Sequence, residues 1–277
     1  MGKLILIPTP IGNLQDITLR ALKTLEEVDL IAAEDTRHSL KLLNHFGIKK
    51  PMISYHQHNQ KSAGEKILAL IAEGKTVGLV TDAGMPGISD PGSEIVSQGI
   101  AAGIAIEVLP GPSAFILGLV LSGFDTREFH FIGFLERKKK ARESQLTAIK
   151  AFPFTTVLYE APHRIMQLLE ELHFHMGSRE VTLARELTKK FEQVIRGPLD
   201  EVIKKMKEQS PKGEFVVVIA GTPEAGPEES GISIKAELEL EMASGYSKKE
   251  AIERVAGHRG IPKKEVYKEA IKINKTL

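Results

Sequence analysis

Residues 77–92 read VGLVTDAGMPGISDPG, and this stretch decides the fold. A short apolar run ends at Thr81, and a loop rich in glycine and proline follows it directly. We expect a helix to open at Pro91 with Asp90 as its N-cap, because proline suits a first helical turn and aspartate caps helices well. A strand that leads through such a loop into a helix is typical of an α/β sheet.

The same alternation of strand and helix patterns continues on both sides of this stretch. Short β-branched runs predict strands at residues 3–8, 30–33, 77–81 and 106–109, and then at 129–134, 156–159, 181–184 and 215–220. Amphipathic segments between them predict helices. The pattern indicates an α/β fold with mostly parallel strands, divided into two α/β domains over residues 1–115 and 116–222.

Two segments of the sequence mark the boundaries of these domains. Leu-Pro-Gly-Pro at 109–112 ends a strand, and Ser113 is placed to cap an apolar helix over 114–121. Residues 221–230 have the composition of a linker.

A C-terminal helical module is predicted over 231–277. Helices at 248–256 and 263–273 would flank a glycine turn, as in a helix-turn-helix, with Ser247 as one N-cap. From residue 245 onward nine basic residues stand against four acidic ones, a net charge of +5. We interpret the module as an aid to RNA docking; a solvated charged face is the alternative.

Composition excludes several classes of function. The 277 residues include 37 basic and 36 acidic ones, so the whole-chain charge of +1 gives no general attraction to polyanions. Without cysteine there is no disulfide framework, thiolate metal site or cysteine nucleophile. The apolar run at the start is too short for a signal sequence, and no window is long enough for a membrane span. We therefore expect a cytoplasmic protein without a membrane partner.

Two loops at strand ends are candidate ligand sites. Residues 8–14, PTPIGNL, hold two prolines that remove amide donors, which suits packing against a flat ligand better than cradling a pyrophosphate. In the 81–92 loop, glycines allow close backbone approach and Asp82 can accept hydrogen bonds. A glycine-rich turn without a ligand remains the alternative. Although DAG at 82–84 is similar to the classical Rossmann methyltransferase loop, that loop follows a first strand, and here a βα unit precedes it.

Seven motifs together resemble the small-subunit ribosomal RNA methyltransferase branch of the tetrapyrrole methylase superfamily. They lie at residues 9–14, 33–37, 81–92, 110–114, 159–164, 185–192 and 213–215, and the match extends to the C-terminus. Tetrapyrrole-modifying members carry Gly-Asp-Pro in the second loop, whereas this chain has Asp82-Ala83-Gly84. That departure favours the RNA branch.

The resemblance implies a fold, a cofactor and an activity. It implies two α/β domains with S-adenosylmethionine in the cleft between them, a homodimer, and 2′-O-methylation of a cytidine ribose in the decoding region of small-subunit ribosomal RNA. Whether the substrate is naked RNA or the assembled small subunit stays open. Matched by motif, the residues expected to bind the cofactor are Pro10, Asp82, Ala83, Gly84, Ile88, Ser113, Ala114, Tyr159, Leu187, Gly213 and Glu214.

Methylation of a ribose hydroxyl needs a group that accepts the proton as charge develops on oxygen. Asp35, Glu160, His56 and Glu186 are the candidates, and the spacing does not choose among them. The alternative role of Asp35 is to cap a helix. The alternative for His56 and His58 is that they are ordinary residues of a surface loop. The two histidines lack nearby ligands to complete a metal site, so we predict no metal.

Basic residues are candidates for phosphate contacts, because guanidinium and ammonium groups bind phosphate and release counterions. The clearest local charge is RKKKAR at 137–142, preceded by an aromatic run, and a solvated helix start is the alternative. The candidate RNA-binding residues are Arg37, Arg164, Lys189, Arg137, Lys138, Lys139, Lys140 and Arg142.

Two other functions compete with RNA methylation. A small-molecule methyltransferase acting on tetrapyrroles would explain the cofactor loops but leave the basic run and the basic tail unused. A non-catalytic RNA-binding or ribosome-assembly factor would explain the basic residues but leave two strand-end loops without a ligand.

Overall fold

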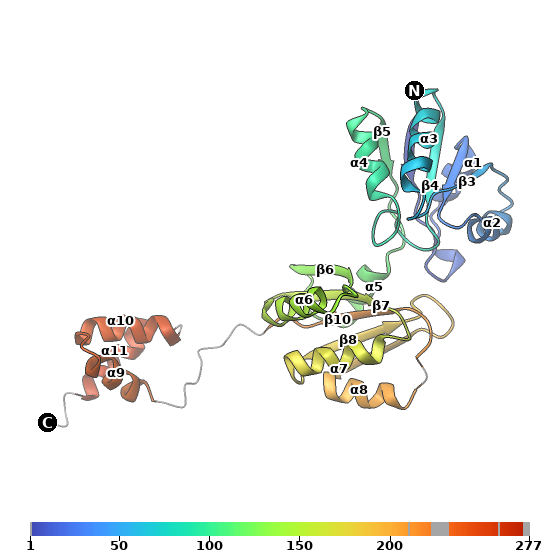
Figure 1. The fold of residues 1–277 in the computed structure, drawn as a ribbon. Helices are drawn as coiled ribbons and strands as arrows, with labels where there is room; N and C mark the ends of the chain where they lie inside the picture. The colour runs from blue at the N-terminus through green and yellow to red at the C-terminus, as the bar shows by residue number, and fades with distance from the viewer. Residues whose placement is uncertain (1, 210, 223–232, 260, 274–277) are drawn as a thin grey trace. The chain divides into compact units, whose positions relative to one another are not determined.

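The computed structural model describes residues 2–209, 211–222, 233–259 and 261–273. The chain divides into two compact units, Met1–Gly221 and Thr222–Leu277. The first unit holds two sheets and the second holds helices (Figure 1). Beyond Thr222 the predicted linker lies outside the described residues, as does Gly260 of the predicted glycine turn.

The first sheet is entirely parallel. Its strand order is β3-β2-β4-β1-β5, with β1 at Lys3–Leu6, β2 at Leu30–Ala33, β3 at Met52–Ser54, β4 at Thr76–Val80 and β5 at Ala105–Val108. Alternate residues of each strand face opposite sides, so Ile5 and Ile7 join one core cluster while Leu4 and Leu6 join another. Such burial on both faces is what a parallel sheet requires.

Helices cover both faces of this sheet. Residues of α1 (Leu19–Glu27) and α2 (Thr36–His45) share the cluster of Ile5, and residues of α3 (Gln60–Ala72) and α4 (Ser93–Ala101) share the cluster of Leu4. A short 3-10 turn, η1 at Leu14–Asp16, precedes α1, whose N-cap Thr18 accepts a hydrogen bond from the Ala21 amide.

The second sheet is mixed, which corrects the expectation of mostly parallel strands. Its order is β6-β7-β10-β8-β9, with β6 at Phe129–Phe134, β7 at Thr155–Glu160, β8 at Glu180–Arg185, β9 at Gln193–Pro198 and β10 at Phe215–Ile219. Only β6 and β7 pair in parallel; β10 runs antiparallel to both of its neighbours, and β8 pairs antiparallel with β9. A short turn between β8 and β9 permits the antiparallel pairing.

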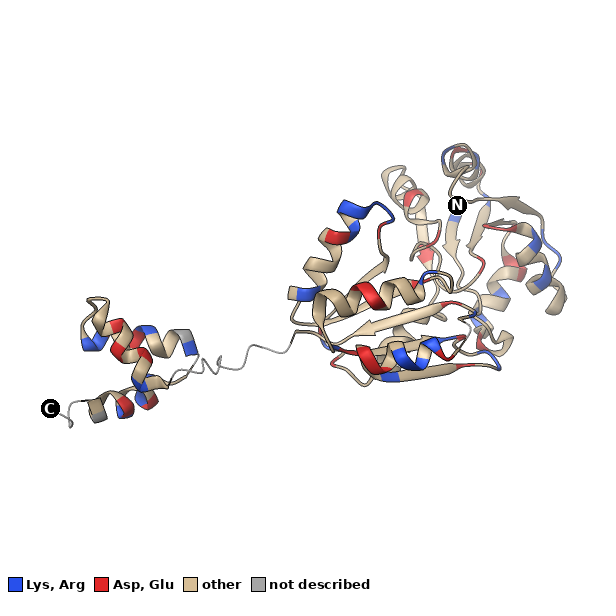
Figure 2. Cartoon of the chain, turned by 60° about the horizontal axis from the view of Figure 1, so that its bottom comes forward, with Lys and Arg blue, Asp and Glu red and all other residues tan. Residues whose placement is uncertain are grey.

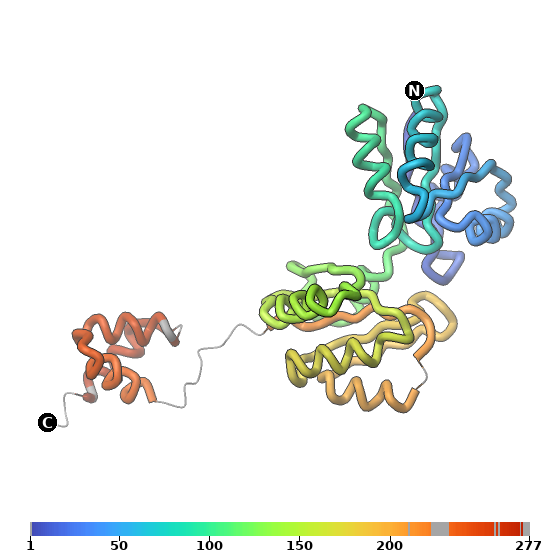
Figure 3. The backbone as a smooth tube through the Cα atoms, viewed as in Figure 1, coloured from blue at the N-terminus to red at the C-terminus, as the bar shows by residue number. Residues whose placement is uncertain are grey.

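The helices of the second sheet lie on its two faces. One face packs against α6 (Lys139–Ala151), α7 (Ile165–Met176) and α8 (Leu199–Lys207), and the other against α5 (Ala114–Ser122). Gly118 lets α5 approach β10 closely, because a Cβ at that position would come within 2.5 Å of Val216 Cγ1. The chain passes from the first sheet to α5 through residues 109–113 (Figure 3). Residue 115, where the first predicted domain ends, lies inside α5.

The predicted start of α4 is wrong. The helix begins at Ser93 with Gly92 as its N-cap, at a φ of 151°. Gly92 packs against Gly87 so closely that a Cβ on Gly92 would lie 2.8 Å from the Gly87 nitrogen. This contact folds the loop back on itself and places Asp90 before the helix rather than at its cap. Ser113 is the N-cap residue of α5, but its side chain makes no capping hydrogen bond.

Two strands were not predicted from the sequence. β3 is a three-residue edge strand with partly exposed side chains, and β9 is a polar edge strand that ends in Gly197 and Pro198. β3 is too short and β9 too polar to show the apolar pattern of a strand, so both sequences resemble loops.

The second unit is a small helical bundle. Its helices are α9 at Ile234–Ala243, α10 at Lys248–Arg259 and α11 at Lys263–Ile273, packed around Leu238, Val255 and Val266. α11 has its predicted bounds, α10 runs three residues beyond its predicted end at residue 256, and α9 is an addition. Because α9 is acidic, residues 231–277 contain ten basic and seven acidic residues, a net charge of +3. Ion pairs at 2.5–2.7 Å join Arg254 to Glu241 and Arg259 to Glu237.

Candidate functional site

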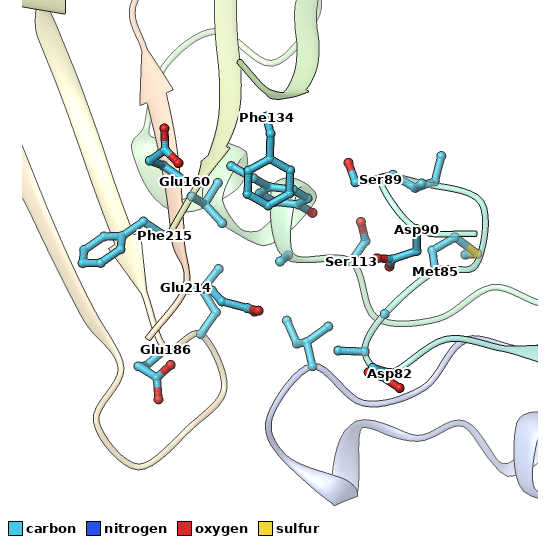
Figure 4. A pocket seen from close by; sticks show the side chains of 18 of the residues that line it. Asp82, Met85, Ser89, Asp90, Ser113, Phe134, Glu160, Glu186, Glu214 and Phe215 are labelled. Atoms are coloured by element: carbon cyan, nitrogen blue, oxygen red, sulfur yellow. The ribbon is translucent and has the colours of Figure 1, made fainter. Parts of the chain in front are cut away.

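A cavity of about 300 Å³ lies in the first unit, between loops of the first sheet and the strand ends of the second (Figure 4). The loop after β4 forms one wall, and the opposite wall comes from the ends of β7 and β10 and the turn after β8. Nine of the eleven residues predicted to bind a cofactor line it: Asp82, Ala83, Gly84, Ile88, Ser113, Ala114, Tyr159, Leu187 and Glu214. The cavity lies at the carboxyl ends of parallel strands, where ligands of α/β sheets bind.

Contacts within the first sheet's loops and between the two halves of the first unit fix the walls of this cavity. Thr9 and Gly84 exchange two backbone hydrogen bonds of 3.0 Å, which tie the loop after β1 to the loop after β4. The Asn13 amide donates to Thr188 Oγ1 at 3.1 Å, across from the first sheet to the second. A Cβ on Gly12 would overlap the Lys189 side chain. The loops that line the cavity therefore support one another.

Backbone strain concentrates at the cavity. Within the described residues, positive φ values in residues other than glycine occur at Ser89 (62°), Glu186 (51°) and Thr188 (66°). Ser89 and Glu186 line the cavity, and Thr188 stands between two lining residues. Such conformations cost on the order of 1 kcal/mol or more each and persist where the surroundings enforce them, often at functional sites.

The two predicted cofactor residues that do not line the cavity, Pro10 and Gly213, are each next in sequence to a residue that does. Pro10 precedes the lining residue Ile11. Gly213 has a φ of 78°, and a Cβ there would overlap the carboxylate of Glu186. Gly213 therefore leaves room for Glu186 while its neighbour Glu214 faces the cavity.

Carboxylates give the cavity a negative character. Burial raises the pKa of Asp90 to about 7, and the negative charges of Glu34, Glu214 and Asp82 add to the effect. Burial is also the main reason why the pKa of Glu34 is raised. Asp82 Oδ1 accepts the Asp35 amide at 3.2 Å. Sequence reasoning missed Glu34 and did not place Asp90 here, because no local pattern shows which side chains a folded loop turns inward.

Aromatic and apolar side chains form the rest of the wall. Phe134 is half exposed and lies 5.7 Å from Tyr159, measured between ring centroids. The Tyr159 hydroxyl accepts the Phe115 amide at 3.1 Å, and burial raises its pKa to about 12. Tyr159 therefore stays protonated near neutral pH and helps to hold the start of α5 beside the cavity.

The four predicted proton acceptors occupy different surroundings. Glu160 is buried and contacts Arg164 at 2.8 Å, and Glu186 contacts Lys189 at 3.0 Å; both carboxylates lie at the margin of the cavity (Figure 4). Asp35 and His56 do not line it. Asp35 caps α2, and its bonds to Arg37 hold its pKa well below the usual range.

The predicted RNA-binding residues also divide into groups. Arg137, Lys138, Lys139 and Lys140 are exposed at the start of α6, where Figure 2 shows basic residues in blue. Lys189 lines the cavity, and Arg37 is exposed but paired with Asp35. Arg164 is partly buried on Glu160.

Arg142 corrects the prediction of a continuous basic surface. Its side chain is 10% exposed, contacts Glu171 at 2.7 Å and lies 3.8 Å from Glu160. The helical period of α6 turns this residue toward α7, away from the lysines that precede it. Arg142 therefore belongs to a buried ion-pair network and is not available to phosphate.

Two other kinds of site are absent among the described residues. No group of three or more His, Asp or Glu side chains is arranged to hold a metal ion. No helix in the same part of the chain is long and apolar enough to cross a membrane.

Comparisons with known proteins agree with the geometry. The family model of the Tetrapyrrole (Corrin/Porphyrin) Methylases matches residues 3–203. Proteins named ribosomal RNA small subunit methyltransferase I are 45% identical in Halalkalibacterium halodurans (96% of this chain, 93% of the relative) and 43% identical in Escherichia coli O157:H7 (98% and 95%). The relative of that name in Thermotoga maritima is 47% identical, and 99% of its length matches 80% of this chain.

Solved structures share the fold at low sequence identity. Diphthine synthase superposes with a TM-score of 0.63 at 18% identity, over 79% of this chain and 89% of its own. Uroporphyrin-III C-methyl transferase from Thermus thermophilus, complexed with S-adenyl homocysteine, gives 0.56 at 20% identity, over 78% and 97%. The chain therefore belongs to the tetrapyrrole methylase family, and within it to the group of proteins named ribosomal RNA small subunit methyltransferase I.

Proposed function

We propose that this protein transfers a methyl group from S-adenosylmethionine to the 2′-hydroxyl of a cytidine ribose in the decoding region of small-subunit ribosomal RNA. The observation that carries the proposal is the 45% identity, over 96% of the chain, to a protein named as a small-subunit ribosomal RNA methyltransferase. The reaction would take place in the cytoplasm, where ribosomal subunits are assembled.

The residues around the cavity fit the chemistry of this cofactor. S-adenosylmethionine carries an ammonium group, a sulfonium, ribose hydroxyls and an apolar adenine ring. Asp82 and Glu214 offer carboxylates to the cations and hydroxyls, and Ile88 and Leu187 offer apolar surface to the ring. A volume of about 300 Å³ is within the range of small-molecule sites.

In this proposal the cofactor supplies an electrophilic methyl group, and the chain supplies alignment. In-line transfer depends on holding the acceptor oxygen close to the methyl carbon, so rigid walls accelerate the reaction. The paired loops after β1 and β4 and the strained turn at Glu186 provide such walls. Tyr159 and Phe134 add a face that limits access of water.

Four cations at the start of α6 are the best candidates for phosphate contacts. Arg137, Lys138, Lys139 and Lys140 are exposed, and none of them pairs with a carboxylate among the described residues. Positive charge is unfavourable at a helix N-terminus, where the macrodipole favours anions. An RNA phosphate bound there would interact with both the cations and the helix, so the arrangement supports an RNA interface.

The C-terminal unit fits a docking role outside the catalytic centre. The Thermotoga maritima relative matches over 99% of its own length but over only 80% of this chain. The unit that holds the cavity, Met1–Gly221, makes up a similar share of the chain. We propose that the helices after Ser233 add RNA affinity through basic residues such as Lys248 and Lys264, and that residues 1–115 and 116–222 act as the two catalytic domains.

A second copy of the chain is the proposed partner of α5. This helix, AFILGLVLS, carries no charge, yet Ile116 is 40% and Val120 is 67% exposed. Helices that are apolar all round are usually buried on all sides. A homodimer would cover this surface, and light scattering on the purified protein would test it.

Methyl transfer from tritiated S-adenosylmethionine tests the function. Assembled small subunits, naked small-subunit RNA and a tetrapyrrole precursor are offered in parallel. Label is expected in RNA, in a fragment that resists alkaline cleavage at the modified ribose. Label in the tetrapyrrole alone would indicate a small-molecule enzyme. RNA binding without label in any acceptor would indicate a non-catalytic factor.

A further inference from the structure

We propose that Asp90 accepts the proton of the attacking ribose hydroxyl. The inference depends on the proposed methyl transfer and adds a catalytic residue to it. From the sequence, Asp90 was expected only as a helix cap. It was not among the four residues first considered as acceptors.

The position of Asp90 is fixed by the loop after β4. Ser89 adopts a left-handed conformation, and the contact between Gly87 and Gly92 folds the loop so that Asp90 lines the cavity. Figure 4 shows its carboxylate directed into the cavity, opposite Glu214. The side chain is partly buried, whereas Glu214 is exposed.

Asp90 is distinguished by what it lacks. Among the described residues no group donates a hydrogen bond to its carboxylate, and no cation pairs with it. Glu34 and Asp82, which line the same cavity, each accept a backbone amide, at 3.4 and 3.2 Å. A carboxylate without donors in partly desolvated surroundings binds a proton more readily than one that is hydrogen-bonded.

The charges that face Asp90 act in the same direction. Glu34, Asp82 and Glu214 approach it from three different segments, and Tyr159 faces it from β7. Burial is the largest cause and these carboxylates the next, and together they raise its pKa to about 7. The cation that lines the same cavity, Lys189, is paired with Glu186. General bases work best when their pKa lies near the working pH.

The earlier candidates are engaged by cations or lie outside the cavity. Glu160 is held by Arg164 at 2.8 Å, and Glu186 by Lys189 at 3.0 Å. Arg37 lowers the pKa of Asp35. The bonds from Arg37 stabilise the charged form of Asp35.

The step balances without a further reactant. The ribose oxygen forms a bond to the methyl carbon as the bond between that carbon and sulfur breaks. The electron pair of the broken bond stays on sulfur, which becomes a neutral thioether. The hydroxyl proton passes to Asp90, and then to solvent on release of the product. Because the positive charge in the cavity disappears in this step, the surroundings favour protonation of Asp90 once transfer has occurred.

Activity measurements provide the first test. Asp90→Asn removes the base with little change in size, and Asp90→Glu retains a carboxylate. Loss of a general base is expected to lower kcat about 100-fold or more. Calorimetric affinity for S-adenosylmethionine should change much less, and Asp90→Glu should recover part of the rate. Asp200→Asn, an exposed change on α8 outside the cavity, is the matched control.

The pH dependence of kcat separates a base from a binding group. For the wild type, kcat should rise with pH as Asp90 ionises and then level off. A cationic cofactor favours the carboxylate, so this midpoint should lie below that of the free protein. In Asp90→Asn the rising limb should disappear.

Carbon-13 NMR titration provides a readout that needs no RNA. In protein labelled at the aspartate carboxyl carbon, the Asp90 signal is assigned as the one lost in Asp90→Asn. Its midpoint should lie near 7 in the free protein, fall when S-adenosylmethionine is added, and fall less with the neutral product S-adenosylhomocysteine.

The outcomes distinguish this inference from the proposed function. If the wild type labels RNA but Asp90→Asn keeps its kcat and pH profile, Asp90 is not the acceptor and the function stands. If Asp90→Asn loses cofactor affinity while kcat is retained, Asp90 is a binding group and the inference is overturned. A wild type that labels no RNA contradicts the proposed function itself, and an ordinary aspartate midpoint near 4 in the NMR titration contradicts the basis of the inference.

Discussion

Replacing Arg142 with alanine tests whether this residue is structural or belongs to the RNA surface. Removing one partner of a buried ion pair costs roughly 3–5 kcal/mol, because the other charge is left without compensation. Here Arg164 still holds Glu160 at 2.8 Å, and the Glu171 side chain is 27% exposed, so solvent recovers part of the loss. We therefore expect Arg142→Ala to lower the free energy of unfolding by about 2–3 kcal/mol.

The assay is thermal and urea unfolding of the full-length protein. At about 2–4 °C per kcal/mol for chains of this size, the expected drop in Tm is roughly 4–12 °C. The effect should be confined to the transition of the unit that contains both sheets. Lys140→Ala is the matched control in the same helix, and it should change stability by about 0.5 kcal/mol or less while weakening RNA binding. An Arg142→Ala protein with unchanged stability and reduced RNA affinity would refute the buried-network interpretation.

Three further predictions concern the cofactor, the stability of the cavity and the tail. Asp82→Ala should weaken S-adenosylmethionine binding at least about tenfold by calorimetry, since one charge-assisted hydrogen bond contributes roughly 1.5–3 kcal/mol; unchanged affinity in a folded variant would remove Asp82 from the site. Folding raises the pKa of Asp90 to about 7, so the native state is favoured below the unfolded pKa near 4 and loses that advantage as pH rises through 7. Asp90→Asn should therefore be more stable than the wild type at pH 8, by about 1–2 kcal/mol after allowing for solvent in the open cavity. The difference in stability should be smaller at pH 4. Equal differences at both pH values would contradict the raised pKa of Asp90. A chain that ends at Gly221 should fold, bind the cofactor normally and methylate its ribosomal substrate poorly, with the defect eased at low salt, whereas full activity at physiological salt would rule out the docking role.

The sequence alone determined the alternation of strands and helices in this protein. Strands such as β2 and β6 were predicted with correct bounds, because short apolar or aromatic runs and the turn residues that flank them are local signals. The eleven cofactor residues came from the motif resemblance, and nine of them line the cavity. The strands β3 and β9 were missed, because β3 spans only three residues and β9 includes polar residues, a glycine and a proline.

Only the tertiary structure decided which charged residues face the cavity and which are neutralised. Arg142 and Lys140 stand two residues apart in one basic run, yet one is buried against Glu171 and the other is exposed. Asp90 was expected at a helix cap, and the packing of Gly87 on Gly92 turned it into the cavity instead. Two of the charges that raise its pKa, Glu34 and Glu214, come from segments that are distant in sequence, and the third, Asp82, lies in the same loop. Burial and Coulomb interactions depend on distances in space, so only the fold determines which of these groups carries the chemistry.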